Sequence, residues 1–244
     1  MQAVLFLRFM AISLLLGSGC TPPVEDAAAT DAYSLARTRM VREQLAAPGR
    51  NLTNPHVLAA MGRVPRHEFV PERVRAEAYA DYPLPIGHGQ TISQPFIVAF
   101  MTDALAPQPG ERFLEVGTGS GYQAAVLADL GVQVFTIEIV AALAQRAAVD
   151  LRRMGYTNVQ VRAGDGYQGW PEHAPFDAVI VTCAPERVPS PLVDQLKDGG
   201  RMIIPVGGMG GQELVVLRKH GDQLEQRAVL PVRFVPMTGS ALGK

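Results

Sequence analysis

The middle of the chain alternates short apolar runs with longer segments in which apolar residues recur every three or four positions. The short runs are rich in Val, Ile and Phe, as buried strands are, and the longer segments have the period of amphipathic helices. This alternation predicts an α/β fold whose parallel sheet carries helices on both faces. The strands are expected at 113–116, 132–137, 159–162, 177–182 and 201–206, and the helices at 120–130, 140–154 and 191–196.

Both ends of this core depart from the alternation. After the last of these strands, two strand-like segments at 213–219 and 226–234 follow one another without a helix between them, so we expect an antiparallel ending to the sheet. Before the first strand, helical patterns begin near Tyr33, at Asn54 and at Pro95. The predicted architecture is therefore a doubly wound, mostly parallel Rossmann-like sheet with an N-terminal helical addition.

The segment 81–95 lies between these helical patterns and is rich in Gly and Pro. We expect no regular structure there, and its composition is typical of a lid or binding loop over 84–90. The segment brings Ser93 to the start of the helix at 95–105. Its hydroxyl has two compatible interpretations, as the N-cap of that helix or as a rigidly held functional group.

The first 20 residues differ from the rest of the chain. An apolar run ends in small residues and Cys20, which is typical of a secretory signal and resembles a bacterial lipoprotein cleavage site with a lipidated cysteine. The alternative is a start codon placed too early, with translation beginning near Met40. The chain then divides into a leader at 1–20, a linker at 21–32 and one domain at 33–244. Within the domain we expect N-terminal helices and the loop at 33–110, the core at 111–206 and the C-terminal strands at 207–244.

Composition excludes several classes of partner and site. The formal net charge of the 244 residues is −1 and no basic run occurs, so we expect no nucleic-acid partner. The chain has two cysteines, too few for a disulfide framework. Its five histidines are scattered without the spacing of metal ligands, so we expect no metal site.

The stretch from Phe113 to Gln123 carries the strongest chemical signal, because a buried strand runs into a glycine turn that opens a helix. Such a turn presents free N–H groups at a helix N-terminus and lets a ligand approach the backbone closely. The dinucleotide fingerprint requires a further glycine at position 122, which is Tyr. Glu115 at the strand end would repel a pyrophosphate but suits an amine or a sulfonium. The pattern favours S-adenosylmethionine over NAD.

Acidic residues also follow the next two strands, at the sheet edge where ligands of such folds bind. Glu138 is placed to accept both ribose hydroxyls, and Asp165-Gly166 lie where an adenine amino group is expected. Each acid alone could be a helix cap or a solvated loop charge. Together with the glycine turn they predict a cofactor site. Its expected residues are Glu115, Gly117, Gly119, Gly121, Glu138, Asp165 and Gly166.

Other enzyme signatures are missing. Gly119-Ser120-Gly121 lacks the spacing of a serine-hydrolase nucleophile. After the fourth strand there is no Asn/Asp-Pro-Pro-Tyr motif of the methyltransferases that act on base or amide nitrogen, which disfavours nitrogen as the methyl acceptor.

From about Tyr33 to Met237 the sequence resembles the protein-L-isoaspartate O-methyltransferase family. The resemblance implies methyl transfer from S-adenosylmethionine to the α-carboxyl of L-isoaspartyl residues in damaged proteins, which starts their conversion to aspartyl residues. It also implies a catalytic role for Ser93, which would orient the carboxylate, and substrate contacts from Ile92, Ser93 and Val206, the last in a turn at 205–207. The motifs that carry it are 91–95, 115–123, 164–166, 175–182, 199–201 and 232–236.

The resemblance agrees with the chemistry, since an α-carboxylate with a pKa of roughly 3.5 is already ionised and needs no general base. It implies isoaspartyl proteins and peptides as partners and a cytoplasmic location, and we expect a monomer. A genuine leader would instead export the protein and anchor it by lipid at Cys20. Two alternative functions stay open. One is a small-molecule O-methyltransferase with the same cofactor site, and the other is a non-catalytic, envelope-anchored binding protein.

Overall fold

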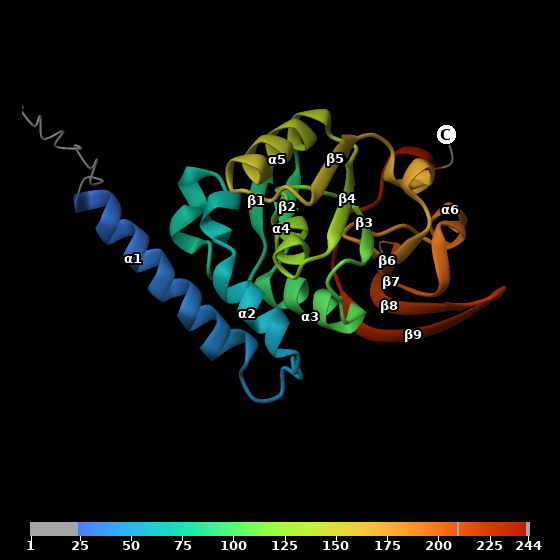
Figure 1. Ribbon diagram of the computed structural model, residues 1–244, viewed down its shortest axis with the longest axis horizontal. Helices are drawn as coiled ribbons and strands as arrows, with labels where there is room; N and C mark the ends of the chain where they lie inside the picture. Colours follow the sequence, from blue (N-terminus) through green and yellow to red (C-terminus); the bar gives the residue numbers. More distant parts are fainter. Residues whose placement is uncertain (1–23, 209, 243–244) are drawn as a thin grey trace, which may run out of the picture.

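The computed structural model describes residues 24–208 and 210–242. Its centre is a seven-stranded sheet in the order β5-β4-β3-β6-β7-β8-β9 (Figure 1). The first five strands in this order are parallel, and β8 and β9 are antiparallel additions at one side. The predicted α/β sheet with an antiparallel ending is therefore confirmed. The strands are β3 (Arg112–Val116), β4 (Gln133–Glu138), β5 (Val159–Ala163), β6 (Phe176–Val181), β7 (Leu196–Gly208), β8 (Gly211–His220) and β9 (Gln223–Val232).

Helices cover both faces of the sheet because successive residues of each buried strand point to opposite sides. Phe113 packs in one core with residues of α3, α4 and α5, whereas its neighbour Leu114 packs in a second core with Leu192 of α6 and the aromatic ring of Trp170. Both neighbours are fully buried, which explains why the strands read as continuous apolar runs. The helices are α3 (Pro95–Leu105), α4 (Tyr122–Asp129), α5 (Ala141–Arg153) and α6 (Ser190–Asp194).

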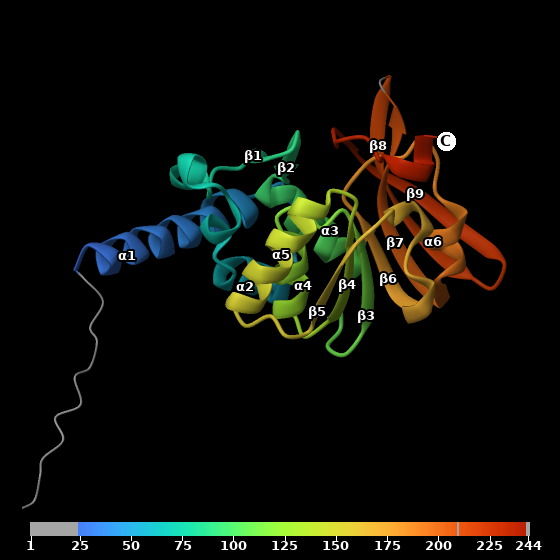
Figure 2. The ribbon, with the colours of Figure 1, turned by 90° about the horizontal axis from the view of Figure 1, so that it is seen from above.

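An N-terminal helical layer precedes the sheet, as predicted. Asn54 caps α2 (Pro55–Arg63) by accepting a hydrogen bond from the backbone N–H of His56. Helix α1 (Val24–Arg39) extends away from the body of the molecule and continues into a π-helical turn at Met40–Leu45 (Figures 1 and 2). Residues 24–32 are thus helical where composition predicts an irregular linker. The expected leader at 1–20 lies outside the described residues.

Side chains of α1 attach it to the layer below. Arg37 donates from Nε to the carbonyl oxygen of Gly62 at 2.7 Å, and Tyr33 stacks on the His67 ring with a centroid distance of 4.1 Å. His67 is in turn hydrogen-bonded to the hydroxyl of Tyr79 at 2.7 Å. In the part of the chain that the structure describes, none of the helices combines the length and the apolar character of a membrane span.

The segment expected to be an irregular loop is a short hairpin, so this prediction was wrong. Strands β1 (Leu84–Gly87) and β2 (Gln90–Ile92) pair antiparallel. The turn residues His88 and Gly89 both have positive φ, which is the requirement of a tight two-residue hairpin turn. Leu84, Ile86 and Ile92 are buried in the main core, so the hairpin is anchored rather than hinged.

Candidate active site

The glycine turn after β3 is shaped by three left-handed backbone positions. Gly117, Gly119 and Gly121 have φ of +96°, +52° and +87°, which other residues adopt only with strain. The Thr182 hydroxyl, at the end of β6, donates to the carbonyl oxygen of Gly117 at 2.7 Å. A Cβ atom on Gly117 would lie 2.4 Å from that hydroxyl oxygen, so the contact between the two strand ends requires glycine. Because the turn occupies these residues, α4 begins at Tyr122 and not at Ser120.

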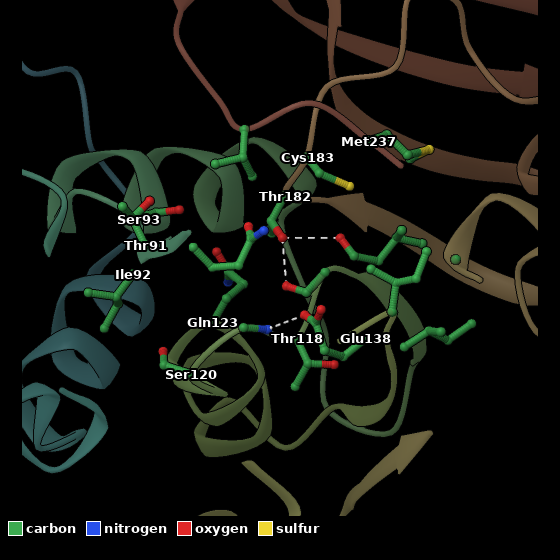
Figure 3. Close-up of a pocket in the computed structure, with 18 of the residues that line it drawn as sticks. Thr91, Ile92, Ser93, Thr118, Ser120, Gln123, Glu138, Thr182, Cys183 and Met237 are labelled. Carbon is green, nitrogen blue, oxygen red and sulfur yellow. Dashed lines mark hydrogen bonds between the residues drawn. The ribbon is translucent and has the colours of Figure 1, made fainter. Parts of the chain in front are cut away.

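Glu138 closes the turn from the neighbouring strand. It ends β4, as predicted, and is 5% exposed. Its Oε2 accepts a hydrogen bond from the backbone N–H of Gly119 at 2.8 Å (Figure 3). Its Oε1 accepts one from the N–H of Val140 at 2.9 Å. The carboxylate is therefore held rigidly, and each oxygen keeps a further lone pair with which to accept from a ligand.

A cavity of about 800 Å³, counting its open mouth, lies over the turn, which is the usual size of a small-ligand site. Segments far apart in the sequence build its walls (Figure 3). Ser93 and Ile92 line one side, and Glu138 and Gly166 line the sheet edge. The lining segments are 90–93, 116–120, 122–123, 137–139, 182–183 and 235–238, together with Val98 and Gly166.

Asp165 acts as a helix cap, which was the alternative interpretation of this acid from the sequence. It caps a short 3-10 turn by accepting from the N–H of Tyr167 at 3.0 Å, and its second oxygen accepts from the N–H of Ser240 at 2.8 Å. Burial acts to raise the pKa of Asp165, but these hydrogen bonds outweigh it and hold the pKa below the usual range. Asp165 does not line the cavity, whereas Gly166 does. A Cβ on Gly166 would lie 2.4 Å from Cγ1 of Val116, so this close approach also requires glycine.

Glu115 lies below the turn and does not reach the cavity surface. Its side chain is fully buried, and neither carboxylate oxygen has a hydrogen-bond partner among the described residues. Burial raises the pKa of Glu115 to about 8; the neighbouring Thr136 hydroxyl acts to lower it, and the nearby charge of Glu138 acts to raise it further. The structure therefore places this acid behind the site rather than in direct contact with a ligand.

Of the three residues expected to contact the substrate, Ile92 and Ser93 line the cavity and Val206 does not. Ser93 follows β2 and lines the cavity beside the buried Ile92. The N-cap of α3 is Gln94, not Ser93, and it makes no side-chain cap bond, so the N-cap interpretation of Ser93 was wrong. Val206 belongs to strand β7, where it pairs with Glu213, and lines neither this cavity nor the next. The expected turn at 205–207 was also wrong, since the hairpin from β7 to β8 turns beyond Gly208.

A second, open groove adjoins the cavity and shares Ser93, Thr91 and Thr182 with it. Its far wall is the segment 231–236 after β9, with Arg233 as its charged residue. No role was predicted from the sequence for Thr91, Thr182 or Arg233. Each of them lies in one of the motifs that carry the family resemblance, at 91–95, 175–182 and 232–236. Their position in these motifs was the signal that could have identified them as site residues.

Comparison with known proteins identifies the family. Residues 37–242 match the protein family described as protein-L-isoaspartate(D-aspartate) O-methyltransferase. The chain belongs to this family. The protein-L-isoaspartate O-methyltransferase of Gloeobacter violaceus is 56% identical over 200 residues, which are 82% of this chain and 97% of that protein. The protein-L-isoaspartate O-methyltransferase 2 of Syntrophobacter fumaroxidans is 51% identical over 243 residues, or 96% of each chain.

Solved structures of the isoaspartate methyltransferase family share the fold. One has a TM-score of 0.74 and 28% sequence identity; the match covers 87% of this chain and 66% of the other. A putative member from Plasmodium falciparum, in complex with S-adenosyl-L-homocysteine, has a TM-score of 0.70 and 25% identity over 84% of this chain and 98% of its own. The sequence-based predictions of family, fold class and enzyme class are confirmed, and the cofactor of this family of methyltransferases is S-adenosylmethionine.

The site itself fits that cofactor. The glycine turn leaves its backbone open to a ligand, and Glu138 offers acceptor oxygens at the cavity wall. Glu138, the carboxylate on the cavity wall, favours ligand groups that donate hydrogen bonds over anionic ones. A pyrophosphate-bearing cofactor would meet this carboxylate at the same place.

Proposed function

We propose that this chain transfers the methyl group of S-adenosylmethionine to the α-carboxyl group of L-isoaspartyl residues in damaged proteins, with Ser93 orienting that carboxylate. The observation that carries the proposal is the position of Ser93, which lines both the enclosed cavity and the adjoining groove. A hydroxyl at this boundary can contact a substrate in the groove and face a cofactor in the cavity at the same time.

The assignment of the cavity to the cofactor follows from its polar groups. Glu138 accepts from the two ribose hydroxyls, for which its rigid carboxylate has free lone pairs. Gly166, which packs closely against Val116 and lines the cavity, marks the place of the adenine, and Asp165 supports this loop by accepting from the N–H groups of Tyr167 and Ser240. The glycine turn accommodates the methionine part, above Glu115.

The bound cofactor supplies an electrophilic methyl group on a sulfonium. The isoaspartyl carboxylate is ionised at neutral pH, so no side chain has to remove a proton. The chain has to hold one carboxylate oxygen in line with the methyl group and to exclude water, which are tasks of positioning and desolvation. A hydrogen bond donated by the Ser93 hydroxyl to the other oxygen fixes this orientation.

The groove favours a peptide over a small molecule as the substrate. It runs from the Pro83 and Thr91 side to the segment 231–236, with an open volume of about 1460 Å³, larger than a single small acid requires. Arg233, which is exposed, offers a cation to acidic groups of the bound peptide. A small-molecule methyltransferase would have no use for this second compartment.

A methylation assay with two peptides tests the proposed function. The peptides have the same sequence and differ only in one isoaspartyl or aspartyl linkage. We expect methyl ester formation on the isoaspartyl peptide alone. Equal methylation of both peptides, or methylation of neither while small carboxylic acids are methylated, would contradict the proposal.

We also propose that residues 1–20 are a lipoprotein leader and that the protein acts as a monomer anchored through Cys20. The apolar run before Cys20 supports the leader. In a bacterial host, Cys20→Ser should abolish lipid labelling and membrane association. Unprocessed wild-type protein found wholly in the cytosol would overturn the leader, and a dimer in sedimentation analysis would overturn the monomer.

A further inference from the structure

Two buried glutamines of this chain differ in how their amides are satisfied. Gln123 and Gln195 are both 7% exposed. Both polar groups of the Gln195 amide are hydrogen-bonded, since its Oε1 accepts from the N–H of Trp170 at 2.7 Å and its Nε2 donates to the carbonyl of Gln168 at 2.8 Å. Gln123 donates from Nε2 to the Thr102 hydroxyl at 2.9 Å, but its Oε1 has no partner among the described residues. A buried acceptor without a donor is costly, so the difference needs a reason.

The orientation of the Gln123 amide is fixed by its neighbours. The Thr102 hydroxyl donates its proton to the carbonyl oxygen of Val98 at 2.8 Å. Its oxygen can therefore only accept from Gln123, and a flipped amide would place two acceptors against each other. The chain of donors runs from Gln123 through Thr102 to Val98 and holds the Oε1 of Gln123 away from Thr102.

The free oxygen belongs to a residue on the cofactor cavity. Other side chains with buried, unpartnered polar atoms among the described residues are Gln44, Arg66, Arg75 and Glu115. None of these lines the cavity, whereas Gln123 does. Figure 3 shows Gln123 on the Ser93 side of the cavity, with Cys183 and Met237 on the other side.

An acceptor in this position selects a donor on the ligand. The hydrogen-bond donors of S-adenosylmethionine are the adenine amino group, the two ribose hydroxyls and the ammonium group of its methionine part. Glu138 is assigned to the ribose and the loop at Gly166 to the adenine. The end of the cavity with Gln123 and Ser93 therefore receives the methionine part.

We propose that the Oε1 of Gln123 accepts a hydrogen bond from the ammonium group of the cofactor and that Thr102 is a positioning residue for this contact. The inference rests on the proposed placement of the cofactor, with the ribose at Glu138. It makes Gln123 a specificity-determining residue for a cofactor that carries a free amino group. A methionine-derived ligand without that group leaves the buried oxygen unsatisfied and binds more weakly.

Calorimetric titration of the full chain tests the contact without any turnover. The ligands are S-adenosylhomocysteine and an analogue in which hydrogen replaces its amino group. We expect the wild type to prefer S-adenosylhomocysteine, and Gln123→Met to reduce this preference by about tenfold or more, mainly by weakening the binding of S-adenosylhomocysteine. Gln195→Met is the matched control. It loses a fully satisfied amide away from the cavity, so it should lower the melting temperature and leave the preference unchanged.

Thr102→Val provides a second variant should Gln123→Met fail to fold. It keeps the glutamine oxygen but releases the amide, and we expect a partial loss of the same preference. An unchanged preference in either folded variant, or equal weakening for both ligands, would overturn the proposal. These outcomes can be distinguished from a failure of the proposed function. Such a failure appears in the peptide methylation assay of the wild-type protein, and it does not change the ratio of the affinities for the two ligands.

Discussion

Replacing Glu115 with glutamine should remove a large part of the dependence of stability on pH. Burial raises the pKa of this carboxyl from its ordinary value of 4.5 to about 8, although the neighbouring Thr136 hydroxyl acts to lower it. Between these two values the folded protein keeps the proton while the unfolded chain releases it. The folded state therefore binds one more proton, so a rise in pH lowers the free energy of unfolding throughout this window. Glutamine has nearly the same shape but no proton to lose.

The size of the effect follows from the two pKa values. One group that is protonated only in the folded state changes the free energy of unfolding by about 1.4 kcal/mol for each pH unit. Across the window from 4.5 to about 8 this amounts to roughly 5 kcal/mol, compared with a total stability of about 5–15 kcal/mol for a typical domain. The effect is fully expressed above pH 8 and absent below pH 4.5.

Urea unfolding of wild type and Glu115→Gln at intervals from pH 4.5 to 9 measures this term. The difference between the two free energies of unfolding should change by about 1.4 kcal/mol per pH unit in favour of the variant and level off near pH 8. Glu213→Gln, at an exposed position of β8, is the matched control and should follow the wild type. Parallel curves for wild type and Glu115→Gln would refute the argument that the buried carboxyl stays neutral.

Two further predictions concern the cavity. Glu138→Ala should weaken S-adenosylhomocysteine binding by about 2–3 kcal/mol in calorimetry, since hydrogen bonds to a charged group are lost; unchanged affinity would mean that Glu138 only supports Gly119 and Val140. Ser93→Ala should reduce kcat/KM for an isoaspartyl peptide by roughly 10- to 150-fold with little change in melting temperature, and Ser93→Thr should keep part of the activity. A lower melting temperature with normal turnover would assign Ser93 a structural role instead.

The local sequence pattern was sufficient to predict those features that depend only on consecutive residues. The apolar runs locate the strands because both faces of this sheet are buried, and the strand ends then place Glu138 and the glycine turn correctly. The hairpin of β1 and β2 was missed because the density of Gly and Pro was interpreted as that of an irregular loop. His88 and Gly89 instead supply the two left-handed positions of one tight turn.

Features that depend on distant partners could not be read from the sequence. The role of Asp165 is set by Ser240, which is 75 residues away, and nothing near Asp165 indicates that contact. The amide of Gln123 is oriented by Thr102 on a different helix, so its significance appears only when α3 and α4 are packed together. Val206 was assigned to a turn because the length of β7 depends on its pairing with β8.

The attachment of the C-terminal segment to the loop at Asp165 has a consequence for synthesis of the chain. The segment 235–238 forms one wall of the cavity, Met237 donates its N–H to the carbonyl of Ala184, and Ser240 is held by Asp165. A nascent chain therefore cannot complete this wall of the cavity until the segment 235–240 has left the ribosome. Because folding during synthesis begins from the N-terminus, the strands and helices of the core can form before this wall does.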